Sequence, residues 1–167
     1  MLIYNKEFQQ IILIDINDYK NISGKYKIIA KNGKGKEFNF KGKIIFEGEY
    51  LNGKRNGQGK EFDYDDDNLQ FKGEYLNGKR NGLGKEYNNN NGKLIFEGEY
   101  LNGKKWTGKG YNYFGKLVYE IVNGKGYIKE YKKEGKFIFE GEYLNGERNG
   151  KGKEYNYDGN LILKANI

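Results

Sequence analysis

The chain has 167 residues and a formal net charge of +7, and it contains 26 Gly, 16 Tyr and 10 Phe but no Pro, Cys or His. The lack of Cys and His excludes disulfide bonds, thiolate zinc sites and catalysis by a thiol or an imidazole. No segment approaches the roughly 20 consecutive apolar residues of a membrane-spanning helix, and residues 1–8 lack the features of a signal peptide. We therefore expect a cytoplasmic protein, soluble or peripheral to a membrane.

Residues 1–25 do not follow the pattern of the rest of the chain, and the apolar run at residues 11–14 predicts a capping strand at the start of a stacked array. From residue 26 onward, a motif of the form aromatic-x-Gly-x-Tyr-Leu-Asn-Gly recurs every 20 to 25 residues. Complete copies begin at Phe46, Phe71, Phe96 and Phe139, and degenerate copies begin at Tyr26 and Tyr119. We therefore predict one structural domain with an N-terminal cap at 1–25, six units at 26–45, 46–70, 71–95, 96–118, 119–138 and 139–162, and a C-terminal tail at 163–167.

The first half of each unit has the alternation of a β-strand. Phe46, Gly48 and Tyr50 fall on one face of an extended segment, whereas Glu47 and Glu49 fall on the other. A helix is disfavoured because Gly is too frequent and no long segment has apolar residues at helical spacing.

The second half of each unit predicts a turn and a returning strand. Asn52-Gly53 and Asn56-Gly57 follow the first strand, and Asn-Gly is the strongest short-range hairpin signal because both residues tolerate positive φ. Gly48 and Gly59 are expected to make room for an aromatic ring that crosses the backbone. A lone hairpin is marginally stable, so the units must stack through their Phe and Tyr residues. The predicted fold is all-β, an elongated single-layer array of stacked antiparallel β-hairpins in the form of a solenoid or trough.

The repeated pattern of aromatic-x-Gly-x-aromatic, Asn-Gly, Lys-Arg-Asn-Gly and Gly-Lys-Glu-aromatic resembles the MORN repeat over residues 26–162. The lead-in Gly-Lys-Leu at residues 92–94 is also similar to a bacterial variant of this repeat found in antitoxin-type proteins. The resemblance implies serial β-hairpins and a role in scaffolding or protein binding, sometimes with self-association. Contact with membranes and phosphoinositides has been proposed for the family.

The repeated rings and the single tryptophan are the candidate contacts to a partner. Trp106 replaces a polar turn residue of the neighbouring units, and Trp is enriched at the energetic centres of interfaces. The alternative is that its ring covers the short unit at 119–138. The candidate partner-binding residues are Trp106, Tyr50, Tyr75, Tyr100, Tyr143, Phe46, Phe71, Phe96 and Phe139.

Basic residues near the turns form a second candidate surface. In a regular array they would lie along one edge, where each charge near an anionic surface contributes about 1 kcal/mol. The alternative is that they are solvated charges without a binding role. The candidate residues for an anionic surface are Lys54, Arg55, Lys79, Arg80, Lys104, Lys105 and Arg148.

The acidic residues do not form a pattern typical of catalysis or of a metal site. The pair Glu47 and Glu49 recurs in register along the chain, whereas a catalytic pair is normally unique. Asp65, Asp66 and Asp67 lack the alternating ligands and the central Gly of a calcium-binding loop. We therefore expect no catalytic residue, no metal, no cofactor and no enzyme activity.

The expected function is a non-enzymatic interaction or scaffold module that binds a segment of another protein along its aromatic-lined surface. One alternative is a membrane-surface adaptor that binds acidic lipids through the basic turns. Another is an immunity or antitoxin-type protein that blocks a cognate toxin. Self-association stays open, and nucleic acid is disfavoured because hairpin stacking already requires the same aromatic residues.

Overall fold

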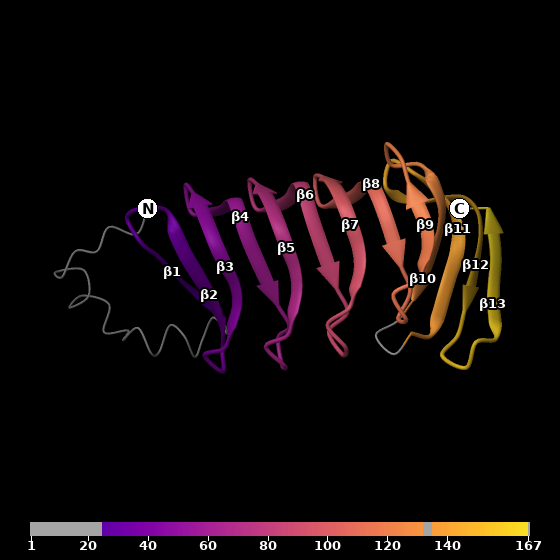
Figure 1. Cartoon of the computed structure of the whole chain (residues 1–167), viewed down its shortest axis with the longest axis horizontal. Helices are drawn as coiled ribbons and strands as arrows, with labels where there is room; N and C mark the ends of the chain where they lie inside the picture. Colours follow the sequence, from indigo (N-terminus) through magenta and orange to yellow (C-terminus); the bar gives the residue numbers. More distant parts are fainter. Residues whose placement is uncertain (1–24, 132–134, 167) are drawn as a thin grey trace, which may run out of the picture.

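The computed structural model describes residues 25–131 and 135–166, and these residues form β-strands without a helix (Figure 1). The predicted capping strand at residues 11–14 lies outside the described residues. The strands are β1 (Lys25–Ile29), β2 (Lys34–Asn39), β3 (Ile44–Leu51), β4 (Lys54–Phe62), β5 (Leu69–Leu76), β6 (Lys79–Tyr87), β7 (Leu94–Leu101), β8 (Lys104–Tyr111), β9 (Leu117–Ile121), β10 (Gly126–Tyr131), β11 (Phe137–Leu144), β12 (Glu147–Tyr155) and β13 (Leu161–Asn166).

Consecutive strands pair in antiparallel fashion, which confirms the predicted all-β hairpin array. They form a nine-stranded sheet in the order β1 to β9 and a four-stranded sheet in the order β10 to β13. Figure 1 shows the hairpins side by side in one elongated row. The sheets part within the degenerate unit, where a single bridge from Val122 to Lys125 joins the ends of β9 and β10. No helix of the described residues is long and apolar enough to cross a membrane.

The end of the chain differs from the expected tail at 163–167, because most of these residues belong to β13. This strand pairs with β12, with Lys153 opposite Lys164 and Glu154 opposite Leu163. The pairing covers an edge of β12 that would otherwise expose unpaired N–H and C=O groups.

The first Asn-Gly of each complete unit forms the predicted hairpin turn. Asn52 and Gly53 have φ values of 50° and 73°, as a two-residue turn with two left-handed residues requires. The second Asn-Gly differs from the expectation, because Asn56 and Gly57 lie inside β4. They are part of a β-bulge at the register shift between β3 and β4, where the Glu49 carboxylate accepts a hydrogen bond from the Gln58 N–H at 2.9 Å.

A row of glycines crosses the nine-stranded sheet at right angles to the strands. Gly48 lies opposite Gly59, and a Cβ at Gly59 would lie 2.5 Å from Cζ of Phe46. The predicted passage of a ring over the backbone is therefore confirmed. The glycines that face one another along this row are Gly35, Gly48, Gly59, Gly73, Gly84, Gly98 and Gly108. In the degenerate unit, Ile121 and Ile128 are buried at the corresponding level.

Candidate functional site

The strands give the array two faces with different chemistry. We call the face that carries Phe46 and Tyr50 the core face, and the face that carries Glu47 and Lys60 the groove face. Alternation along each strand keeps this division from unit to unit. Any contact with another molecule therefore has to be sought on one of two surfaces.

On the core face, the repeated rings form the interior of the protein. Phe46 packs edge-on against Tyr50, with ring centroids 5.6 Å apart, and against Tyr75 of the next unit at 5.1 Å. Phe71 makes the same two contacts, with Tyr75 and Tyr100. The exposed fractions of Phe46, Phe71, Phe96 and Phe139 are 0 to 1%. These rings, with the buried Tyr50, Tyr75 and Tyr100, therefore form the core, whereas Tyr143 is only partly buried.

A layer of ion pairs covers these rings. The guanidinium of Arg55 lies 4.1 Å from the centroid of the Phe46 ring, and it donates hydrogen bonds to Glu37 at 2.7 Å and Glu61 at 3.0 Å. Arg80 continues the layer by donating to the other oxygen of Glu61. Each arginine thereby links a carboxylate of the preceding unit to one of its own.

The same layer of ion pairs continues toward the second sheet, but one of its arginines is replaced by a lysine. Lys105 stands where other units have arginine, and its Nζ lies 2.8 Å from Glu86 and 4.9 Å from the centroid of the Phe96 ring. Arg148 again binds Glu130 through two nitrogens and lies 4.0 Å from the centroid of the Phe139 ring.

The ion-pair layer sets the protonation of its carboxylates. Burial alone would raise the pKa of Glu37. The hydrogen bonds and the positive charge of Arg55 outweigh this effect, so the pKa lies below its ordinary value. The pKa of Glu86 is lowered in the same way by Lys105 against the effect of burial, and that of Glu130 by Arg148.

We expect the protein to lose stability in acid. A carboxylate whose folded pKa is depressed stabilises the fold above its unfolded pKa, near 4.5, and this contribution is lost as the pH falls through the folded pKa. The midpoint of urea unfolding should therefore fall between about pH 6 and about pH 3. The variant Glu130→Gln has one such group fewer and should show a smaller fall. Equal midpoints at both pH values would contradict this role of the ion-pair layer.

The candidate basic residues divide between the core face and the turns. Four of them, Arg55, Arg80, Lys105 and Arg148, belong to the ion-pair layer and are satisfied by protein carboxylates. Lys104 pairs with Glu147 of the second sheet at 2.8 Å. Lys54 and Lys79 are exposed at the beginnings of β4 and β6. The turns therefore carry fewer unpaired basic side chains than the sequence pattern indicates.

Trp106 lies at the junction of the two sheets. Its carbonyl oxygen accepts a hydrogen bond from the Gly124 N–H at 2.7 Å, and a Cβ at Gly124 would lie 2.7 Å from Cζ3 of its ring. The half-buried ring thus contacts the turn between β9 and β10, as expected if it covers the short unit. That Trp106 also contacts a partner stays a prediction.

The groove face carries a row of charges that face one another from strand to strand. In chain order the row consists of Lys36, Glu47, Lys60, Lys72, Lys85, Glu97, Lys109 and Glu120. Some of the opposite charges that meet form ion pairs, such as Lys36 with Glu47 at 3.7 Å and Lys85 with Glu97 at 3.2 Å. The middle of the row departs from this alternation, because three lysines follow one another.

We call Lys60, Lys72 and Lys85 the lysine strip. Lys60 lies opposite Lys72, and Lys72 lies opposite Lys85. The sequence contained a signal for this strip, since Lys72 occupies the motif position that is glutamate in Glu47, Glu97 and Glu140. The strip was not predicted, because Lys60 and Lys85 are ordinary members of the Gly-Lys-Glu-aromatic motif and the strand register places them next to Lys72.

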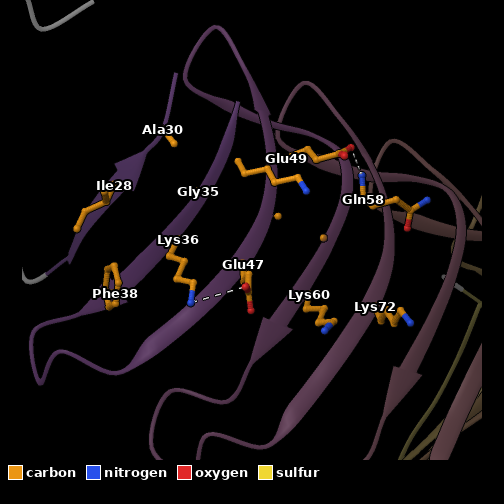
Figure 2. Close-up of a pocket in the computed structure, with 13 residues that line it drawn as sticks. Ile28, Ala30, Gly35, Lys36, Phe38, Glu47, Glu49, Gln58, Lys60 and Lys72 are labelled. Carbon is orange, nitrogen blue, oxygen red and sulfur yellow. Dashed lines mark hydrogen bonds and ion pairs between the residues drawn. The ribbon is translucent and has the colours of Figure 1, made fainter. Parts of the chain in front are cut away.

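A groove with a volume of about 510 Å³ lies on this face over strands β1 to β5. Its floor includes the backbone of Gly35, Gly48 and Gly59. Figure 2 shows the two rows that border it. One holds Lys36, Glu47, Lys60 and Lys72, and the other holds Glu49 and Gln58. A side chain at any of these glycine positions would point to the core face, so the floor of the groove is the strand backbone between two rows of side chains.

A second hollow, of about 530 Å³, lies where the two sheets meet and includes Lys105, Tyr119 and Glu130 in its lining. Its central charged groups already have partners, because Lys105 pairs with Glu86 and Glu130 pairs with Arg148. Within the described parts of the chain, no cluster of three or more potential metal-ligating side chains occurs. The groove is therefore the candidate binding site.

The fold and its two faces define an open β-hairpin repeat protein. Residues 46–67, 71–93 and 139–161 match the family model of the MORN repeat, so the chain contains this repeat at three positions. The unit at 96–118, which contains Trp106, lies outside the matched segments although it forms the same hairpin. No curated protein matches the chain. MORN repeats are in general non-enzymatic modules that bind proteins or membranes.

Proposed function

We propose that this protein is a non-enzymatic binding module that holds an extended segment of a partner protein in the groove. The observation that carries the proposal is the continuous channel over β1 to β5, with a glycine floor between two rows of polar side chains. The floor is strand backbone that another extended chain can lie against between the two rows. The two rows then supply polar groups that orient the segment along the array.

The core face offers less to a partner. Its rings are buried, and the residues above them are engaged in ion pairs between units. A partner that bound there would have to displace these pairs or contact only their half-exposed edges. We therefore assign the partner surface to the groove face and keep Trp106 as a candidate contact at the far end of the nine-stranded sheet.

The test places a larger side chain in the groove and leaves the buried rings of the core unchanged. Gln58 is exposed in the groove lining, and the equivalent positions hold Leu83 and Lys151, so the site accepts different side chains. A photo-cross-linking amino acid at Gln58 should attach to one segment of a partner protein in a native lysate. Gln58→Trp should reduce recovery of that partner about tenfold or more, as expected for the loss of a closely packed contact.

The matched control is Phe114→Trp, because Phe114 is 79% exposed in the loop between β8 and β9, outside the groove. It should leave recovery unchanged. A partner that is retained by Gln58→Trp would contradict the proposal. A membrane-adaptor role through Lys54 and Lys79 and a toxin-blocking role both stay predictions, as does the cytoplasmic location.

A further inference from the structure

We infer that the partner segment is acidic and that the lysine strip binds its carboxylates. This inference rests on the proposed function, and it identifies the chemistry of the partner. The occupant is a stretch of extended polypeptide with a short run of Asp or Glu residues, which lies across β4, β5 and β6 at the lysine side of the groove.

The first observation is the repulsion built into the sheet. Side chains directly opposite each other have Cβ atoms about 4.5–5.5 Å apart, and like charges at that position are destabilising. Lys72 faces a lysine on both sides, at Lys60 and Lys85. Elsewhere in the charged row of the nine-stranded sheet, each lysine faces a glutamate. In the four-stranded sheet Lys153 faces Lys164, but Glu140 pairs with Lys153 there at 3.0 Å.

The second observation is that two ammonium groups of the lysine strip are not paired with a carboxylate of the described residues. Within residues 25–131 and 135–166, no ion pair or hydrogen bond engages the ammonium groups of Lys60 and Lys72, and both side chains are exposed. Lys85 is exposed too, and its one partner is Glu97 at 3.2 Å. Two adjacent ammonium groups without a counter-ion on a groove wall are complementary to an anion from outside the chain.

The third observation selects the kind of anion. The opposite row of the groove carries Glu49, which lies opposite Lys34 and accepts a hydrogen bond from the Gln58 N–H at 2.9 Å. A broad anionic surface such as an acidic bilayer would meet the Glu49 carboxylate as well as the lysines. A narrow peptide can place its carboxylates at the lysine strip alone. Strands are about 4.8 Å apart, so the strip spans about 10 Å, which an extended chain covers in about three residues.

The experiment measures binding and stability in the same variant. The probe is a fluorescein-labelled peptide of alternating Glu and Ser, and its affinity is measured by fluorescence anisotropy at low and at physiological ionic strength. Lys72→Glu should weaken binding about tenfold or more, because it removes one attraction and adds one repulsion. The same substitution should raise the midpoint of urea unfolding, because it creates opposite charges next to Lys60 and Lys85. Weaker binding in a more stable protein cannot result from misfolding.

Lys116→Glu is the matched control, since it changes the net charge equally at an exposed position in the loop before β9. It should bind the peptide as the unchanged protein does. The inference is overturned if the peptide does not bind, if Lys72→Glu binds it normally, or if only vesicles of acidic lipid bind and Lys72→Glu releases them. In each of these cases, loss of the cross-linked partner in Gln58→Trp would still support the proposed function by itself.

Discussion

Replacement of Phe71 by alanine is expected to lower the free energy of unfolding by about 3–5 kcal/mol, the usual cost of removing a fully buried phenylalanine. The ring is 0% exposed and contacts Tyr75 and Tyr100, with centroids 5.6 Å and 5.1 Å away. The guanidinium of Arg80 also lies 4.1 Å from its centroid. The substitution therefore removes the packing inside one unit and the contact to the next at the same time.

Urea unfolding followed by circular dichroism measures this effect. In a stacked array, stability is approximately the sum of unit stabilities and of the interfaces between neighbouring units. Loss of an interface in the middle of the nine-stranded sheet should therefore also broaden the transition or divide it into two. Phe114→Ala removes the same atoms from a side chain that is 79% exposed, and it should change stability by less than about 0.5 kcal/mol. Equal effects of the two substitutions would contradict the assignment of Phe71 to the core.

Replacement of Gly59 by alanine is expected to cost about 3 kcal/mol, at the upper end of the range for overpacking a core. The added Cβ would lie 2.5 Å from Cζ and 2.7 Å from Cε2 of Phe46, and 3.1 Å from Cε2 of Tyr75. The Phe46 ring cannot move away easily, because it is fully buried between Tyr50 and Tyr75. The ring or the strand must therefore shift.

The control for this substitution is Gly115→Ala. Gly115 has a φ of 85° and no atom within 4 Å of an added Cβ, so the change imposes backbone strain without a steric conflict. Its cost should be about 1 kcal/mol. Thermal or urea unfolding of both variants separates the two causes. A Gly59→Ala variant no less stable than Gly115→Ala would show that the ring does not require the glycine.

These expectations follow from features that the sequence predicted for different reasons. Gly48 and Gly59 stand out because they recur at fixed places in each unit, and Gly in a strand indicates a close approach. Asn52-Gly53 specifies a turn in which both residues have positive φ. The second pair, Asn56-Gly57, has the same local signal but forms a bulge, because a carboxylate from the facing strand binds the backbone there. Local sequence cannot distinguish the two outcomes, since the deciding contact comes from another strand.

The candidate site was less accessible to prediction. The sequence showed that rings and charges alternate, but both faces of a single-layer sheet are plausible binding surfaces. Arg55 and Arg80 had the pattern of exposed basic turns, whereas each is held by carboxylates of two units. Lys72 was visible as a departure from the motif, but its neighbours in space, Lys60 and Lys85, are identified by the strand register.

The sequence by itself determined the strands, the turns, the repeat and the places of the glycines, because these depend on residues close together in the chain. The tertiary structure decided which face buries its rings, how the ion pairs cross between units, and where the nine-stranded sheet ends. It also aligned the three lysines of the strip. All of these depend on register, which bulges such as the one at Glu61 and Phe62 shift by a residue. One residue of shift moves a side chain to a different neighbour, and no local pattern records that choice.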